Sequence, residues 1–173
     1  MSRWRAGLWL AVVLALSGCG YQALNGRNPF GPGAQSIELK SFENDTREPG
    51  LEQLVGEAMN EEFARRGLLK PQLEGQGAAD LVLRGTLLSA TVHSSSYSSG
   101  ALALEEGIDV AFNVSVHRVS NGELVWQHND LHMREVFLSS ADPQVYVSNK
   151  EQALRRISSE IAERVHDELF QKF

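Results

Sequence analysis

Residues 108–116 read IDVAFNVSV, and this segment sets the architecture of the chain. Its apolar residues recur at every second position, at Ile108, Val110, Phe112, Val114 and Val116. That period is typical of a strand with one face on a core and the other in water. Such a strand requires paired neighbours and an apolar layer over its buried face.

The segment before it predicts one of those neighbours. Residues 79–92 place Leu81, Leu83 and Leu87 on a common face, which indicates a long strand. The polar residues 94–100 then follow, and we expect them at the tip of a hairpin.

The segment after it predicts a second hairpin. Asn121-Gly122 is a strong turn signal, and residues 123–138 follow as a strand. A two-residue turn and a three-residue loop at this dipeptide give registers that differ by one residue. The two registers put opposite faces of residues 123–138 on the core, and the sequence does not choose between them.

Toward the N-terminus, residues 36–42 alternate as a first strand and lead to a turn at Asn44-Asp45-Thr46. A helix is expected between Pro49-Gly50 and Gly67, and residues 68–77 form a loop or a short edge strand. Gly56 inside this helix costs about 1 kcal/mol relative to Ala, and we expect close packing to compensate. The apolar stripe of the helix consists of Leu51, Leu54, Val55, Ala58, Met59 and Phe63.

A second helix closes the chain. Asp142-Pro143 ends the preceding strand, and Ser148 with Glu151 forms a capping box, which predicts a helix start near residue 149. Its apolar stripe consists of Leu154, Ile157, Ile161, Val165 and Leu169.

The predicted order is therefore β-α-β-β-β-α, in one domain over residues 36–173. Each element has a single apolar face, so two layers suffice. We expect an α+β two-layer sandwich, in which one mostly antiparallel four-stranded sheet carries two helices on one face.

The N-terminus has the pattern of an export signal. Arg3 and Arg5 precede an apolar run over residues 6–16, which at 11 residues is too short to span a membrane. Leu16-Ser17-Gly18-Cys19 resembles the bacterial lipoprotein box, so residues 1–18 are expected to be removed and Cys19 to be acylated. Gly20, in place of an Asp, favours the outer membrane by the same resemblance.

Residues 19–35 are rich in Gly and Pro and predict a lipidated tether. The expected location is lipid-anchored on the periplasmic side of the outer membrane.

The charge balance limits the partners. The chain carries 16 basic and 22 acidic residues, and removal of residues 1–18 leaves 14 basic residues and a net charge of −8. So acidic a protein is not expected to bind nucleic acid, although a small local basic site is compatible with it.

Motifs of catalysis are absent from the sequence: it has no nucleophile elbow, phosphate loop or dinucleotide fingerprint. His128, Asp130 and His132 would share a face of a strand and are the best metal candidates, but polar residues on a wet strand face explain them more simply. We therefore expect no enzyme, no metal site and no cofactor.

Basic residues on or near the predicted strands and before the second helix are the better binding candidates. Such a sheet has one face free of helices, which is available to a partner. The residues are Arg84, His117, Arg118, Arg134 and Lys150.

Several motifs occur in a characteristic order from Cys19 to the second helix. They are Cys19-Gly20-Tyr21, Phe42-Glu43-Asn44-Asp45-Thr46, Gly50-Leu51-Glu52, Ala79-Asp80-Leu81-Val82-Leu83-Arg84-Gly85 and Gly122-Glu123-Leu124-Val125-Trp126. In this order and spacing they resemble the lipopolysaccharide-assembly lipoprotein family LptE.

The resemblance implies a small plug inside the outer-membrane β-barrel LptD, in a complex that moves lipopolysaccharide to the outer leaflet. It also implies that the plug helps the barrel to assemble and binds lipopolysaccharide through basic residues. Asp142-Pro143-Gln144 resembles the segment before one binding position of the family, which makes Lys150 the first candidate. The other position, near the 94–100 tip, has no basic match, so Arg84 and Arg134 are the remaining candidates.

Two alternatives remain. Lipoproteins that regulate a peptidoglycan synthase or build a secretion pore can share a strand, a similar turn and a helix, although residues 122–126 favour the plug. A periplasmic hydrolase or metal enzyme is the other alternative, and no motif supports it.

Overall fold

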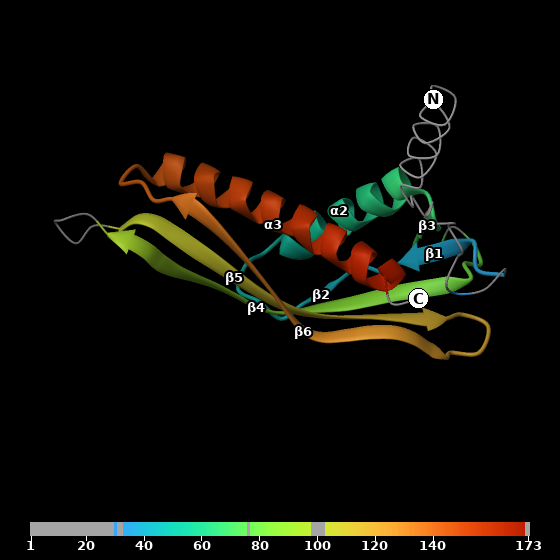
Figure 1. Cartoon of the computed structure of the whole chain (residues 1–173). Coiled ribbons are helices and arrows are strands. Elements are labelled where there is room, and N and C mark those ends of the chain that lie inside the picture. Colours follow the sequence, from blue (N-terminus) through green and yellow to red (C-terminus); the bar gives the residue numbers. More distant parts are fainter. Residues whose placement is uncertain (1–29, 31–32, 76, 98–102, 172–173) are drawn as a thin grey trace, which may run out of the picture.

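The computed structural model describes residues 30, 33–75, 77–97 and 103–171. The predicted signal peptide, Cys19 and most of the tether lie outside the described residues. The elements, shown in Figure 1, are β1 (Ser36–Leu39), β2 (Glu43–Asn44), α2 (Leu51–Arg66), β3 (Lys70–Leu73), β4 (Leu81–Tyr97), β5 (Ala103–Arg118), β6 (Leu124–Leu138) and α3 (Pro143–Gln171).

The sheet is built on β5, which contains the alternating segment 108–116. It pairs antiparallel with β4 on one side and with β6 on the other. The strand order is β3-β1-β4-β5-β6, and β2 also pairs with β4. Since β1 runs parallel to both β3 and β4, the sheet is mixed, with an antiparallel meander of three long strands.

The expectation of four strands is wrong, because the sheet has six. Residues 70–73 form an edge strand in spite of Pro71. The N–H of Lys70 donates to the Gln35 carbonyl, so Lys70 points its N–H into the sheet. The nitrogen of the next residue, Pro71, therefore points to the open edge, where a missing N–H costs no hydrogen bond. The predicted strand 36–42 is shorter than expected: β1 ends at Leu39, and Phe42 packs over Gly85. β2 follows at residues 43–44, at the start of the predicted turn.

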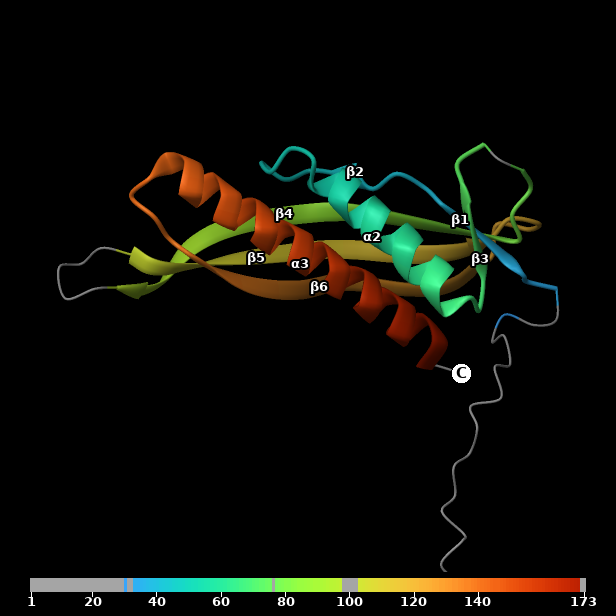
Figure 2. The same ribbon diagram turned by 90° about the horizontal axis from the view of Figure 1, so that it is seen from above.

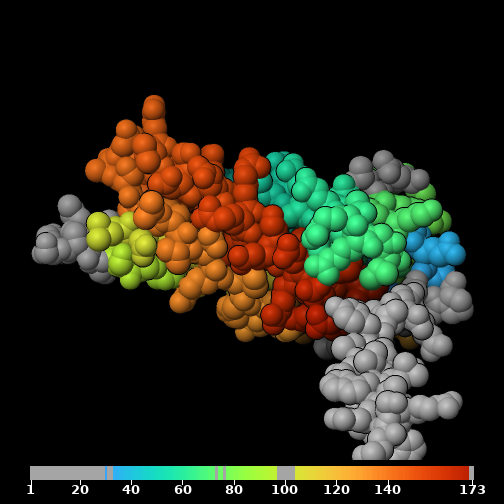
Figure 3. Space-filling view, turned by 45° about the horizontal axis from the view of Figure 1, so that its top comes forward, coloured from blue at the N-terminus to red at the C-terminus, as the bar shows by residue number. Residues whose placement is uncertain are grey.

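Both helices cover the same face of the sheet, as expected (Figures 1 and 2). Figure 3 shows this covered face, where α3, in orange to red, lies against α2, in green. The core between the layers includes the alternating residues of β5, and Phe112 at its centre is fully buried. No helix of the described residues covers the opposite face of the sheet, which remains polar along β5.

Helix α2 matches the sequence expectation closely. It begins after Gly50 (φ 84°) and ends at Gly67 (φ 67°), whose N–H donates to the Phe63 carbonyl over 3.1 Å. The expectation of close packing at Gly56 is wrong, since a Cβ there would meet nothing within 4 Å.

Helix α3 begins earlier than predicted. Asp142 is the N-cap: its carboxylate accepts the N–H of Gln144 over 2.9 Å, and Pro143 takes the first helical position. Ser148 and Glu151 therefore lie within the helix, and the predicted capping box is wrong. No helix in the described residues is long and apolar enough to cross a membrane.

Next to the turn, β5 and β6 pair in neither of the two predicted registers. The N–H of Arg118 donates to the Glu123 carbonyl, which closes a four-residue loop. Irregularities then shift the pairing by one residue near Val125 and by another near Asp130, where φ is +59°. Trp126 faces the core before the second shift, and Leu131 and Phe137 face it afterwards.

Candidate functional site

Lys150, the first binding candidate, lies on α3 at the side of the helix layer. Its Nζ is 2.5 Å from Oε1 of Glu48, in the turn that precedes α2. The side chains are 23% and 17% exposed, so this ion pair is partly shielded from water. It borders a surface groove of about 500 Å³ between the 45–48 turn, residues 88–92 of β4 and the first turns of α3.

The turn that carries Glu48 is held by Asn44 at the end of β2. The Asn44 side-chain oxygen accepts from the backbone N–H and the hydroxyl of Thr46, over 3.0 and 2.7 Å. Its side-chain nitrogen donates to the Glu48 carbonyl over 2.9 Å and to Glu52 over 2.5 Å. The Glu48 N–H donates to the Thr46 hydroxyl over 3.1 Å, so both backbone groups of Glu48 are fixed.

One turn of α3 before Lys150, Tyr146 packs edge-on against Phe137 with 5.6 Å between ring centroids. Its hydroxyl donates to Glu106 over 2.9 Å, and the Ser139 hydroxyl donates to the same carboxylate over 2.9 Å. Burial, followed by the hydrogen bond and the negative charge of Glu106, raises the pKa of Tyr146. The phenol therefore stays neutral beside Lys150 and provides a fixed wall for the groove.

Arg84 lies on the uncovered face of the sheet. It stands opposite Ser115 on β5, which in turn stands opposite Gln127 on β6, so three polar side chains cross the sheet in a row. A second groove, of about 220 Å³, runs along this row and includes Asn113 and His117. Arg84 is exposed, and no carboxylate pairs with it among the described residues.

Arg134 lies on the same uncovered face but is already paired. Its guanidinium donates two hydrogen bonds to Asp109, over 2.6 and 3.1 Å, and His93 is 3.1 Å from the same carboxylate. The hydrogen bond from Arg134 lowers the pKa of Asp109, and the same contact raises the pKa of Arg134. This pairing leaves Arg134 less available to an external anion than Arg84.

The structure does not bring the three candidates together. Lys150 lies on the helix side, whereas Arg84 and Arg134 lie on the uncovered face. The β5 residues opposite them, Ser115 and Asp109, are six positions apart, or about 20 Å along the strand. Of the other basic candidates, Arg118 donates to the Phe30 carbonyl over 3.3 Å, and His117 lies 3.2 Å from the Ser115 hydroxyl.

The shift near Asp130 separates the sequence candidates for a metal. His128 faces α3 and pairs with Glu168, whereas His132 is exposed, 3.0 Å from Asp130. The described residues contain no group of three or more His, Cys, Asp or Glu that could hold a metal ion.

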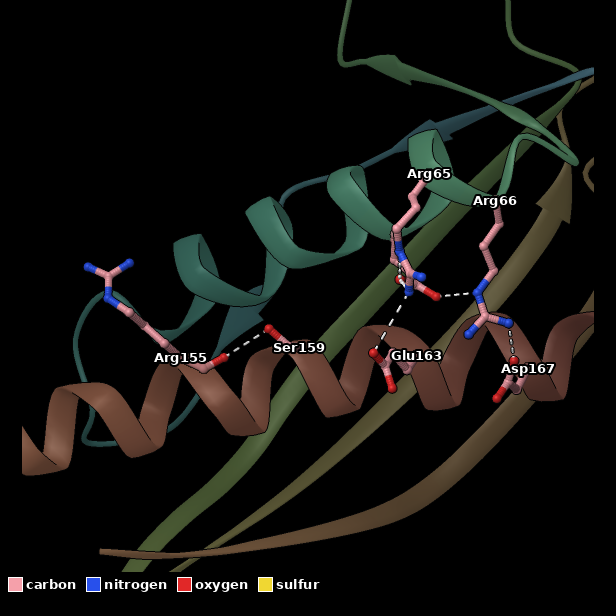
Figure 4. Close-up of polar contacts among 7 residues, drawn as sticks. Arg65, Arg66, Arg155, Ser159, Glu163 and Asp167 are labelled. Atoms are coloured by element: carbon pink, nitrogen blue, oxygen red, sulfur yellow. Dashed lines mark hydrogen bonds and ion pairs between the residues drawn. The ribbon is translucent and has the colours of Figure 1, made fainter.

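Sequence reasoning missed a polar network between the helices (Figure 4). Glu62 of α2 is buried and accepts from both Arg65 and Arg66. Arg66 also bonds Asp167 of α3, and Arg65 lies 3.8 Å from Glu163. The pKa of Glu62 is lowered because the two arginines outweigh the effect of burial. Arg65 and Arg66 follow Glu62 by three and four positions, which is the spacing of ion pairs on a helix and could have predicted these pairs from the sequence. Through Arg65 and Arg66 the network connects α2 to α3.

The comparisons with solved structures give the fold. The chain is similar to a minor lipoprotein from Acinetobacter baumannii, with 15% identity over 80% of this chain and 92% of that one, and a TM-score of 0.51. It is also similar to a candidate lipoprotein from Caulobacter crescentus CB15, with 14% identity over 76% and 88% of the two chains and a TM-score of 0.54. A hypothetical protein from Chlamydia trachomatis has 11% identity over 79% and 98%, with a TM-score of 0.52.

No curated protein matches the chain. The model of one family, LptE, described as lipopolysaccharide-assembly, matches residues 34–169, which include every helix and strand from β1 to α3 except the last two residues of α3. This protein therefore belongs to the lipopolysaccharide-assembly family LptE.

Proposed function

We propose that this protein is an outer-membrane lipoprotein that plugs an LptD-like β-barrel, helps that barrel to assemble and takes part in moving lipopolysaccharide to the outer leaflet. The family match over residues 34–169 carries the proposal. The family is one of lipopolysaccharide assembly and not of catalysis, in agreement with the lack of catalytic motifs in the sequence.

The two faces of the sheet support a plug. The helix side is closed by an apolar core, so the domain buries this face without a partner. The other face presents neutral polar side chains around the second groove, including Asn113, Ser115 and Gln127, which suits the water-filled interior of a large barrel. Along β6 it also exposes Leu124, Val136 and Leu138.

Lipopolysaccharide binding is the finer part of the proposal. Lipid phosphates need only a few charge-assisted donors, so an acidic protein can bind them through one local site. Lys150, with an adjacent groove, is our first candidate, Arg84 is the second, and Arg134 is the weakest because Asp109 already neutralises it.

The lipid anchor at Cys19 belongs to the same proposal. Removal of residues 1–18 and acylation of Cys19 would hold the domain at the periplasmic side of the outer membrane. Phe30 and Ala34 of the predicted tether are buried in the core of the domain, so the length available to a tether ends before Phe30. Residues 19–29 reach up to roughly 36 Å when extended.

Co-purification tests the proposal. The full-length protein, extracted from membranes in mild detergent with an affinity tag after residue 173, should bring down one large outer-membrane β-barrel in equal amount. Recovery of a penicillin-binding protein or a secretion-pore subunit would support the alternative instead. Recovery of the protein alone from intact membranes would contradict the plug.

Binding of purified lipopolysaccharide tests the site. Lys150→Gln should weaken it several-fold because a desolvated donor is lost. The control is Lys172→Gln, which makes the same change of charge at the far end of the chain. Equal affinity of the wild type and Lys150→Gln would remove Lys150 from the proposal.

A further inference from the structure

Lys150, the first binding candidate of the proposed function, is already paired with Glu48 of its own chain. Glu48 takes one N–H of the Lys150 ammonium and offsets its charge at 2.5 Å, so an external anion must compete with Glu48 for Lys150. The candidate donor is thus occupied by a carboxylate of its own chain. Any role of Glu48 in binding therefore rests on the proposed role of Lys150.

The backbone of Glu48 cannot easily move away. Its N–H and carbonyl are fixed by hydrogen bonds to Thr46 and Asn44. The turn is also tied to the sheet, because Asn44 pairs with Leu87 of β4 and the Asp45 N–H donates to the Leu87 carbonyl over 3.0 Å.

The side chain of Glu48, in contrast, is held by a single contact. Lys150 is its one hydrogen-bond and ion-pair partner among the described residues. A change of side-chain rotamer would therefore uncover the ammonium without unfolding the turn.

The charges around the groove define what could replace Glu48. Asp45 and Glu48 offset Arg47 and Lys150, so the lining is formally neutral. Arg47 is exposed and has no ion-pair partner among the described residues. When Glu48 turns away, two cations face one carboxylate, and the groove favours an anion.

A phosphate monoester competes better than another carboxylate would. It carries about −1.5 to −2 charges at pH 7 and three acceptor oxygens, against a single charge on Glu48. The apolar side of the groove, formed by Leu88, Ala90 and Val92, suits the hydrocarbon next to a lipid phosphate.

We propose that Glu48 is an internal competitor that covers Lys150, and that a phosphate monoester group binds in the groove by displacing it. The Asn44 turn holds the competitor in place, and the gap in charge between phosphate and carboxylate sets the selectivity. Anions of lower charge bind more weakly because they displace Glu48 less readily.

The test measures binding of fluorescently labelled lipopolysaccharide to the full-length protein in detergent. Glu48→Gln removes the competing charge and should tighten binding about three- to fivefold, as expected for loss of a partly exposed ion pair. Asp45→Asn is the matched control, since it makes the same charge change in the same groove without touching Lys150. It should alter the affinity much less.

A double variant, Glu48→Gln with Lys150→Gln, should bind no better than Lys150→Gln alone. Unlabelled inorganic phosphate should displace the labelled lipid from both proteins, with a lower inhibition constant for Glu48→Gln than for the wild type. Failure of phosphate to compete would overturn the assignment of a phosphate group. Thermal unfolding of each variant confirms that the fold is retained.

The outcomes separate the two proposals. If Lys150→Gln weakens binding but Glu48→Gln does not tighten it, Lys150 remains a binding residue and the internal competitor is wrong. If Glu48→Gln and Asp45→Asn tighten binding equally, general charge explains the effect and the competitor is again wrong. If Lys150→Gln has no effect, both the site and its competitor are wrong.

Discussion

Two glycines of this domain show how a single side chain can be required or excluded by its surroundings. Gly85 on β4 lies under the ring of Phe42, and a Cβ at that position would be 2.1 Å from the Phe42 Cε1 atom. Gly56 on α2 faces open space. Gly85 is therefore needed for the packing of Phe42. Gly56 has no such role, and its main effect is to raise the backbone entropy of the unfolded chain, which lowers stability.

Substitution of these glycines by alanine should therefore change stability in opposite directions. Gly85→Ala should lower the free energy of unfolding by about 1–3 kcal/mol, because Phe42 must move out of the core. Gly56→Ala should raise it by about 0.5–1 kcal/mol. Urea unfolding of the two variants measures both effects, and destabilisation by Gly56→Ala would show that the position is not open.

His166 is a buried titratable residue that sequence reasoning passed over. It lies in the core between Phe63 and Phe170, with centroid distances of 5.1 and 4.5 Å. Neither ring nitrogen has a hydrogen-bond partner among the described residues. Burial, and then the nearby charge of Arg66, lowers the pKa of His166 from 6.5 to about 4, in spite of Glu62 and Asp167.

This histidine should make the fold sensitive to acid. Between pH 6.5 and 4 the unfolded chain binds a proton at His166 that the folded chain does not, so stability is full above pH 6.5 and falls as the pH falls. The loss should reach up to about 3 kcal/mol. Urea unfolding at pH 7, 5.5 and 4.5 measures it, with His166→Phe as the control that removes this part of the dependence. Parallel curves for the two proteins would contradict the prediction.

At the scale of elements, the start of α3 illustrates how two capping signals compete. Asp142 and Ser148 both precede helix-forming residues, and either could serve as an N-cap by sequence. Tertiary contacts favour the earlier start, because Tyr146 in the first turns packs on Phe137 and bonds Glu106. Those contacts require residues 143–148 to be helical.

The two caps predict different costs of mutation. Asp142→Ala should lower the free energy of unfolding by about 1 kcal/mol, since it removes the acceptor for the Gln144 N–H. Ser148→Ala should change it by less than about 0.5 kcal/mol, as for an ordinary position inside a helix. Chemical denaturation of the pair distinguishes them, and a larger cost for Ser148→Ala would restore the capping box.

The pairing of β5 with β6 shows where local sequence loses its predictive power. The alternation along β5 correctly identified its buried face, and Asn121-Gly122 lies in the turn as predicted. The register could not be derived, because two irregularities each move the pairing by one residue. Each shift exchanges the β6 residues that face the core with those that face away from it. Nothing in residues 124–138 marks these positions until the long β5 strand is laid beside them.

At the scale of the whole molecule, the sheet separates a rigid side from a polar side. The helix pair is held by apolar contacts and by the ion pairs of Arg66 with Asp167 and of Arg65 with Glu163. The opposite face is covered by no helix in the part of the chain that the structure describes. We expect the domain to be stably folded before it meets a barrel, and the acylated Cys19 to attach it to the membrane until then.

Loss of the lipid should therefore change where the protein is located without changing its stability. Cys19→Ala, produced in excess over the barrel, should leave the surplus protein in the soluble periplasmic fraction, because no acyl chain can then be added. Its melting temperature after purification should match that of the same domain released from the wild type. Membrane fractionation followed by immunoblotting checks the first point, and unchanged membrane association would argue against acylation at Cys19.

The sequence alone determined the fold class, the helix α2 with its glycine ends, the three long strands and the family motifs, since each depends on periodicity or on contiguous residues. It named Lys150, Arg84 and Arg134 without their partners. Only the tertiary structure decided that Glu48 covers Lys150, that Asp109 neutralises Arg134 and that Arg84 lies on the opposite face from Lys150. Glu48 is 102 positions away from Lys150 in the chain, and charge pairing over such a separation depends on how the layers pack, which no local pattern encodes.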